Sequence, residues 1–300
     1  MNIINFKHSI VFFNLCILVS PLNKIIDINL IICLFLILII GISHGSLDNI
    51  KGRKLLKIFG FKSEYIFYII YLTISSLIIL LWIIFPNTVL LIFLIVACYH
   101  FGKEDTVFFV NKEILFKEIL YFFKGSSVII APLLFHREET IEIFRALNFN
   151  IFENSLFSDT FLLIFLFLGL ISSFFLSHKK DINFKILLMT DFLSILIINF
   201  FLSPILAFTL YFCFLHSIRH SITLIFELDK SFNNGFRKFI KKAIPLTLIT
   251  SFAFIVAIYL LNNFYELNEA IYKVIFIGLA SLTFPHILLE YLIEKNEKRN

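Results

Sequence analysis

The sequence predicts an all-α protein, a polytopic bundle of nine or ten transmembrane helices whose C-terminus faces the cytoplasm. Of its 300 residues, 59% are hydrophobic and 16% are charged, whereas a soluble domain carries roughly 25% charged residues. The apolar residues form long runs instead of alternating or amphipathic patterns, which is typical of membrane-spanning helices. No stretch rich in Pro, Gly and Ser separates these runs, so residues 1–300 are expected to form a single integral membrane domain.

Each predicted span is an apolar run of about 20 residues, the length that crosses a hydrocarbon core of ~30 Å. The strong candidates run near 25–43, 64–85, 114–135, 160–177, 183–202, 204–227, 240–262 and 270–292, and a shorter one covers 88–102. The first run, 9–20, is marginal and ends at Ser20-Pro21. It resembles a signal-peptide core but has no small-x-small cleavage site, so we interpret it as a short first helix.

The loops predict the orientation, because Lys and Arg accumulate on the cytoplasmic side of a membrane protein. One set of loop segments holds 19 Lys and Arg residues and comprises 48–63, 103–118, 178–185, 228–242 and 293–300. The alternate set holds two and comprises 86–88, 136–159, 199–204 and 263–269. The first set and the C-terminus are therefore expected to face the cytoplasm. Topology then explains the net charge of +5, which gives no indication of a nucleic-acid partner.

The cysteines predict neither a disulfide framework nor a structural zinc site, because all lie in apolar runs and no two form a C-x-x-C pair. We expect all four to be cysteines with free thiols that pack in the protein interior, namely Cys16, Cys33, Cys98 and Cys213.

Five of the eight histidines lie within or at the end of apolar spans, where an ionisable side chain is costly unless it is paired or binds something. They are His44, His100, His216, His220 and His286. In the predicted orientation, all five fall between the middle of the membrane and its cytoplasmic surface. This shared depth favours one functional site over five separate structural histidines. The remaining three are expected at the solvated surface, namely His8, His136 and His178.

The segment HSIRH (216–220) places His216 and His220 one turn apart on one helix face. At this spacing both imidazoles can bind one metal ion, and imidazole suits Fe, Cu, Zn and Ni. Arg219 points in another direction around the helix, and the sequence assigns it no role.

Acidic residues near these histidines could accept hydrogen bonds from metal-bound imidazoles. Each follows the histidine of its own segment by four or five residues, and the set comprises Asp48, Glu104, Asp105 and Glu290. For Asp48 and Asp105 there is an alternative interpretation as interfacial charges beside Lys51 and Lys103.

Four segments together resemble the Brp/Blh family of membrane-bound β-carotene 15,15′-dioxygenases and occur in the order of that family. They are GISHGSLD (41–48), YHFGKED (99–105), HSIRH (216–220) and PHILLE (285–290), so the resemblance covers about residues 41–290. The family more often has Pro before and Ala after the His-Gly pair of the first segment, where this chain has Ser43 and Ser46. Both differences leave the imidazole of His44 in place.

The resemblance implies an enzyme that uses O2 and non-haem Fe(2+) to cleave the central 15,15′ double bond of β-carotene into two molecules of all-trans retinal. Matching the motifs residue by residue assigns the iron ligands to His44, His100, His216 and His220. His286 is then either a fifth ligand or, like the carboxylates of Asp48, Asp105 and Glu290, a neighbour that supports the ligands.

The resemblance and the charge pattern together place the protein in the inner (plasma) membrane, with its site toward the cytoplasm. A retinal-binding opsin is the expected downstream partner. Because β-carotene has no polar group and dissolves in the bilayer, we also expect a hydrophobic tunnel that opens to the membrane.

Other classes of membrane protein also use intramembrane histidines. A transporter could bind a metal ion or relay protons at such a cluster, but acidic residues throughout the membrane depth and paired broken helices would then be expected. A di-iron desaturase or hydroxylase usually carries several H-x-x-x-H and H-x-x-H-H clusters, whereas this chain has one H-x-x-x-H. A haem-binding bundle is a further alternative.

Overall fold

The computed structural model describes residues 2–22, 29–61, 63, 65–106, 114, 116–149, 158–177 and 182–297, and for residues 2, 22, 44 and 297 it describes the backbone alone. Every regular element in these ranges is a helix, and ten helical stretches are long and apolar enough to cross a membrane. The predicted fold class, a polytopic helical bundle of nine or ten spans, is confirmed. The first stretch, Ile3–Pro21, contains the marginal run 9–20.

The helices of the first half are α1 (Asn2–Leu22), α2 (Leu30–Leu36), α3 (Asp48–Ile58), α4 (Tyr65–Ile84), α5 (Pro86–Glu104), α6 (Lys117–Phe135) and α7 (Arg137–Ala146). Those of the second half are α8 (Asp159–Leu176), α9 (Ile182–Phe201), α10 (Pro204–Leu210), α11 (Ile218–Leu228), α12 (Phe232–Leu261) and α13 (Leu267–Glu297). Two spans change their helical geometry partway. The π-helical η1 (Ile37–Gly41) and the 3-10 helical η2 (Ile42–Leu47) join α2 to α3, and the π-helical η4 (Tyr211–Ser217) joins α10 to α11.

Two short helices lie in segments for which the sequence predicts loops. α3 occupies part of the expected cytoplasmic loop 48–63, and α7 occupies part of the expected outer loop 136–159. The first turn of α7 contains Glu138 and Glu139 and its last turn contains Arg145, charges that suit the positive and negative ends of the helix dipole. Because charged residues mark loops and short surface helices alike, the charge pattern alone does not separate the two.

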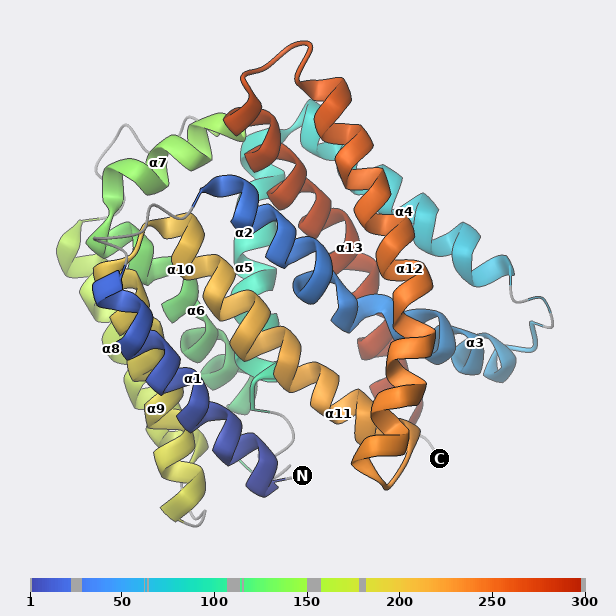
Figure 1. The fold of residues 1–300 in the computed structure, drawn as a ribbon, viewed down its shortest axis with the longest axis horizontal. Helices are drawn as coiled ribbons and strands as arrows, with labels where there is room; N and C mark the ends of the chain where they lie inside the picture. Colours follow the sequence, from blue (N-terminus) through green and yellow to red (C-terminus); the bar gives the residue numbers. More distant parts are fainter. Residues whose placement is uncertain are drawn as a thin grey trace.

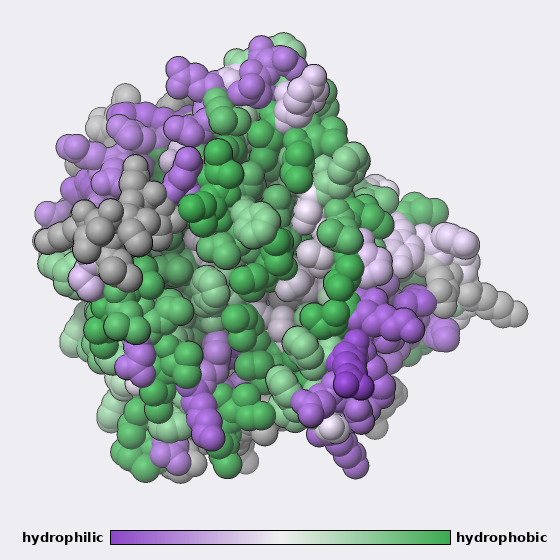
Figure 2. Space-filling view, viewed as in Figure 1, coloured by the Kyte–Doolittle hydropathy of each residue, from purple (hydrophilic) through white to green (hydrophobic). Residues whose placement is uncertain are grey.

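Figure 1 shows how the connections alternate between the two ends of the bundle. The α11–α12 connection and the C-terminus lie at one end, and the α12–α13 connection lies with α7 at the other. Figure 2 shows hydrophobic residues between these ends, with hydrophilic residues gathered over α7, over the α12–α13 connection and near the α11–α12 connection. The bundle therefore has an apolar middle and hydrophilic residues at both ends.

The backbones of α5 and α6 are in contact, and two glycines make this possible. A Cβ atom on Gly102 would lie 1.8 Å from the carbonyl oxygen of Tyr121, and one on Gly125 would lie 1.9 Å from that of Cys98. Small residues allow such close approach in membrane bundles, where helix association depends on van der Waals contact. The contact holds the end of α5 that carries His100 against α6.

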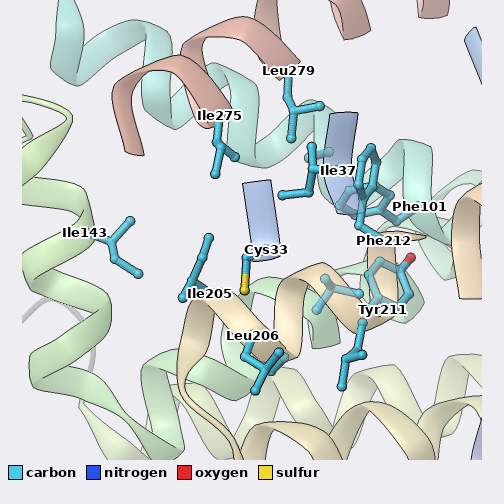
Figure 3. Close-up of a cluster of buried hydrophobic side chains, with 14 of the residues drawn as sticks. Cys33, Ile37, Phe101, Ile143, Ile205, Leu206, Tyr211, Phe212, Ile275 and Leu279 are labelled. Carbon is cyan, nitrogen blue, oxygen red and sulfur yellow. The ribbon is translucent and has the colours of Figure 1, made fainter. Parts of the chain in front are cut away.

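The largest hydrophobic cluster surrounds the irregular segments η1 and η4. Figure 3 shows part of it, including Ile37 of η1 with Phe101 and Phe212, whose ring centroids lie 6.4 Å apart. The four cysteines are buried without disulfide bonds, as expected. Segments of π geometry are rare and occur frequently at functional sites. Here η1 leads directly into the segment that contains His44, and η4 contains His216.

Candidate metal centre

Four of the five predicted histidines come together in one buried cluster. The centroid of the His100 ring lies 5.3 Å from that of His216 and 5.5 Å from that of His286. The centroid of the His220 ring lies 5.8 Å from that of His286. The four residues come from α5, η4, α11 and α13, and none is more than 6% exposed. The common depth that the sequence predicts therefore corresponds to contact between the rings.

The fifth histidine, His44, belongs to η2, which packs against η4 and α11. These two elements carry His216 and His220, so the chain brings the backbone of His44 to the neighbourhood of the cluster. The side chain of His44 lies outside the part of the chain that the structure describes.

Two adjacent acidic residues at the end of α5 support the two histidines of the HSIRH segment. Nδ1 of His216 lies 3.0 Å from Oδ1 of Asp105, and Nδ1 of His220 lies 3.0 Å from Oε2 of Glu104. When a carboxylate accepts the Nδ1 hydrogen, Nε2 becomes the nitrogen through which the ring can bind a metal ion, as is common at metal-bound histidines. Both acids follow His100 in the sequence, yet each contacts a histidine of another element.

Asp48 reaches a histidine 238 positions further along the chain. Nδ1 of His286 lies 2.9 Å from each carboxylate oxygen of Asp48, and the hydroxyl of Tyr71 lies 3.1 Å from Oδ2 of Asp48. The sequence gives no sign of these contacts, because Asp48 follows His44 and Tyr71 belongs to a span without histidines. Side-chain direction and helix order, which the sequence does not reveal, decide the pairing.

Burial distinguishes between the two interpretations of Asp48 and Asp105. These residues are 5% and 2% exposed, and both carboxylates contact histidines. Burial and the histidine contacts favour the supporting role over the alternative interpretation as interfacial charges beside Lys51 and Lys103. Lys103 instead forms a 2.8 Å ion pair with Glu294 of α13.

Glu290 lies close enough to the histidines to be a ligand in its own right. One ligand atom from each of Glu290, His220 and His286 lies within 4.8 Å of the other two. Two histidines and one carboxylate with further positions open are typical of non-haem Fe(II) oxygenases, so this donor set fits iron. Glu290 also forms a 2.7 Å ion pair with Lys51 of α3, which holds the carboxylate near the cluster.

Arg219 forms a fully buried network behind the cluster. Its guanidinium donates to the two carboxylate oxygens of Asp191 at 2.6 and 3.0 Å and to the hydroxyl of Ser9 at 2.6 Å. It also donates to the carbonyl oxygen of Asp105 at 3.2 Å. Asp191 is a residue that the sequence analysis missed, although the signal was present: it is the only acidic residue in the apolar run 183–202, and an acid at membrane depth usually pairs with a cation.

Asp105 joins this network to the histidine cluster. Its side chain accepts a 2.7 Å hydrogen bond from the hydroxyl of Tyr211 and lies 3.0 Å from His216. Burial alone would raise the pKa of the Asp105 carboxyl. The hydrogen bond and charge of His216 and the charges of Lys124 and Arg219 outweigh burial and lower this pKa below its usual value. This direction favours the ionised carboxylate as the partner of His216.

The three histidines expected at the solvated surface have different outcomes. For His8 the expectation is wrong, because it is half-buried and its Nε2 lies 2.7 Å from the carbonyl oxygen of Phe214. The reason is that α1 is a full helix of the bundle and packs against η4. His136 is partly exposed, with Nδ1 3.5 Å from the carboxylate of Glu139, and His178 lies outside the described residues.

Aromatic rings also border the cluster. Phe208, Phe212 and His216 follow one another at successive turns, and their rings are stacked with centroid separations of 5.4 and 5.8 Å and interplanar angles of 9° and 16°. Phe101 meets the His216 ring edge to face at 5.0 Å. The histidines therefore contact both carboxylates and apolar aromatic rings.

A small cavity adjoins the cluster on this aromatic side. Its volume is about 20 Å³, and its lining includes His100, Ala97, Leu279 and Thr283 together with phenylalanines of α5, α10 and η4. Pockets for drug-sized ligands have volumes of roughly 300–1,000 Å³. The hydrophobic tunnel expected for a long apolar substrate is therefore not open at this position.

Comparison with known proteins gives a family and a curated relative. The sequence model of the family described as beta-carotene 15,15'-dioxygenase matches residues 35–294. The chain is also similar to a protein named beta-carotene 15,15'-dioxygenase from uncultured marine bacterium 66A03. The two are 26% identical over 278 residues, which cover 89% of this chain and 94% of that protein. No solved structure matches.

Proposed function

This chain belongs to the beta-carotene 15,15'-dioxygenase family, and we propose that it cleaves the central 15,15′ double bond of β-carotene with O2 to give two molecules of all-trans retinal. The reaction consumes one carbon–carbon double bond and one O2 and forms two carbonyl groups, each of which takes one oxygen atom. The two carbons lose four electrons and O2 gains four, so the reaction needs no other reductant. Family membership favours this function over a metal or proton transporter, a desaturase or a haem protein.

We propose that Fe(2+) is held by His44, His100, His216 and His220, with His286 as a further ligand. The observation that carries this assignment is the buried contact between the four described rings, three of which hold Nδ1 against a carboxylate. Bound iron would supply the redox chemistry that O2 requires. The role of the chain itself is to fix the ring orientations and, through burial, to keep water away from them.

The aromatic side of the cluster is the side that we assign to β-carotene. The substrate has no charged or polar group, so an apolar surface beside the histidines suits it, whereas the carboxylate side does not. Phe101, Phe208 and Phe212 provide such a surface against His216. Because the cavity beside His100 is only about 20 Å³, side chains on this side must move before the polyene can reach the histidines.

We propose the inner (plasma) membrane as the location, with the metal centre toward the cytoplasmic side. The 19 Lys and Arg residues on one set of loop segments, against two on the other set, support this orientation. β-carotene enters from the bilayer and retinal returns to it, where a retinal-binding opsin is the partner that we propose downstream.

Expression in β-carotene-producing bacteria tests this function directly. The wild-type chain should remove the carotenoid colour and produce retinal, which chromatography of the extracted pigments would identify. His216→Ala and His220→Ala should abolish retinal formation, whereas His136→Ala, outside the cluster, should not. Wild-type retinal yields from His216→Ala or His220→Ala would remove those residues from the site, and shorter apocarotenals from the wild type would place cleavage at another bond.

A further inference from the structure

The cavity beside His100 is matched in size to a very small molecule. Its volume is about 20 Å³, and a cavity must offer roughly 10–15 Å³ by a water-sized probe to hold one water molecule. One diatomic molecule therefore fits without displacement of any side chain. A polyene does not fit, because the volume is far below the roughly 300–1,000 Å³ of pockets for drug-sized ligands.

The lining of the cavity is unsuited to water. A buried water typically makes about three hydrogen bonds, whereas apolar cavities stay dry and take up apolar molecules. Among the residues that the structure describes, only His100 and Thr283 contribute polar side chains to this lining, and the others are alanine, leucine and phenylalanines. The cavity therefore favours a small apolar occupant.

The position of the cavity connects it to the histidine cluster. His100, whose ring contacts those of His216 and His286, forms part of the cavity wall. Phe212, which is stacked on His216, forms another part. A molecule in the cavity therefore lies directly against the residues to which we assign the metal, on the side from which apolar molecules arrive.

From the size, lining and position of the cavity, we propose that it is the O2-binding pocket of the enzyme. This inference rests on the proposed function, which requires O2 to reach the histidine cluster from the apolar interior of the bundle. O2 is small and apolar and dissolves well in hydrocarbon, so the aromatic interior offers it a path that excludes water. The pocket holds O2 beside His100, ready to react when the polyene arrives.

Ala97→Val tests the pocket, because it adds two methyl groups to a cavity that has room for one small molecule. In purified enzyme, the initial rate of retinal formation is measured against O2 concentration, and the apparent KM for O2 should rise by roughly tenfold. This is the lower end of the effect that one added methylene has in a tight apolar pocket. The apparent KM for β-carotene and the iron-to-protein ratio should stay at the wild-type values. Thr283→Ile, which enlarges a half-buried side chain, should have the same effect and provides a second test if Ala97→Val does not fold.

Val96→Ile is the matched control. It adds one methylene to the neighbouring residue of α5, which is half-buried and does not line the cavity, so both KM values should stay unchanged. A raised KM for β-carotene with a normal KM for O2 in the cavity variants would assign the cavity to the polyene and overturn the inference. Unchanged values for both substrates would also overturn it. If the wild-type enzyme forms no retinal at any O2 concentration, the proposed function fails instead.

Discussion

Nδ1 of His216 lies 3.0 Å from Oδ1 of Asp105, although the two residues are 111 positions apart in the sequence. The same carboxylate accepts a hydrogen bond from Tyr211, and the backbone carbonyl of Asp105 accepts one from Arg219. Asp105 therefore occupies the junction between the histidine cluster and the buried ion pair. Its substitution should show how far the cluster depends on the carboxylates that surround it.

Asp105→Asn keeps the size of the side chain but removes the charge that holds His216. Loss of a carboxylate that orients a metal-bound histidine typically costs roughly 10–100-fold in metal affinity or activity, and we expect a loss in this range. The iron-to-protein ratio of purified protein and the rate of retinal formation provide the two measurements. Asp229→Asn, on the exposed α11–α12 connection, is the control and should resemble the wild type. Wild-type iron content and rate in Asp105→Asn would show that this carboxylate does not support the metal.

The gathering of the histidines in one place could be predicted from the sequence, but their partners could not. The rings of His100 and His286 are in contact, as the prediction of one shared histidine site requires. The choice of Asp48 as the partner of His286 depends on which helices are neighbours, which residue spacing within one segment does not reveal. For the same reason the structure was needed to find Asp191, which is on α9, as the partner of Arg219 on α11.

The positions of the π-helical and 3-10 helical segments could not be predicted from the sequence either. The π-helical segments η1 and η4 and the 3-10 segment η2 depend on how the two spans pack against each other, and their residues have the same apolar composition as regular helices. The small size of the cavity depends on the positions of side chains such as Phe208 and Phe212, which line it. In contrast, helix number and fold class follow from the apolar runs, which burial in lipid requires.

Disruption of the buried pair between Arg219 and Asp191 should destabilise the protein strongly. Removal of one partner leaves an uncompensated charge, which costs roughly 3–5 kcal/mol, so Asp191→Leu should lower the melting temperature of the protein in detergent markedly. The double variant Arg219→Met with Asp191→Leu should recover much of this loss, because apolar replacement of a buried ion pair is often neutral. Lys238→Ala, which breaks the exposed pair with Asp229, is the control and should leave the melting temperature unchanged. A melting temperature of Asp191→Leu equal to that of the wild type would show that Arg219 needs no partner.

Gly102 and Gly41 provide a pair of substitutions that distinguish backbone contact from side-chain contact. A Cβ atom on Gly102 would lie 1.8 Å from the backbone oxygen of Tyr121, so Gly102→Ala must separate α5 from α6. We expect little monodisperse protein, since overpacking in a core costs roughly 1–3 kcal/mol or more. A Cβ atom on Gly41 would lie 2.6 Å from a side-chain atom of Phe212. A side chain is displaced at lower cost than a helix backbone, so Gly41→Ala should fold and show reduced activity. Size-exclusion chromatography and retinal yield test both, and equal yields of folded protein from the two variants would contradict the distinction.

The position of His286 supports our proposal that it is a metal ligand, and the alternative is that it only supports the other histidines. Its ring lies 5.5 Å from that of His100 and 5.8 Å from that of His220, and Nδ1 faces Asp48, so Nε2 is the nitrogen available to a metal in this orientation. We therefore expect His286→Ala to lower the iron-to-protein ratio as much as His216→Ala does. Chelation of the wild-type enzyme should abolish activity, and added Fe(2+) should restore it in the wild type but not in His286→Ala.

The control for this experiment is His8→Ala, because His8 is half-buried, contacts the carbonyl oxygen of Phe214 and lies outside the ring cluster. It should retain iron. If His286→Ala retains the iron content of the wild type and loses only rate, His286 acts on the reaction without holding the metal. The ligand set would then be restricted to the histidines of the first three family segments, and the carboxylate of Asp48 would serve to position His286 beside the substrate.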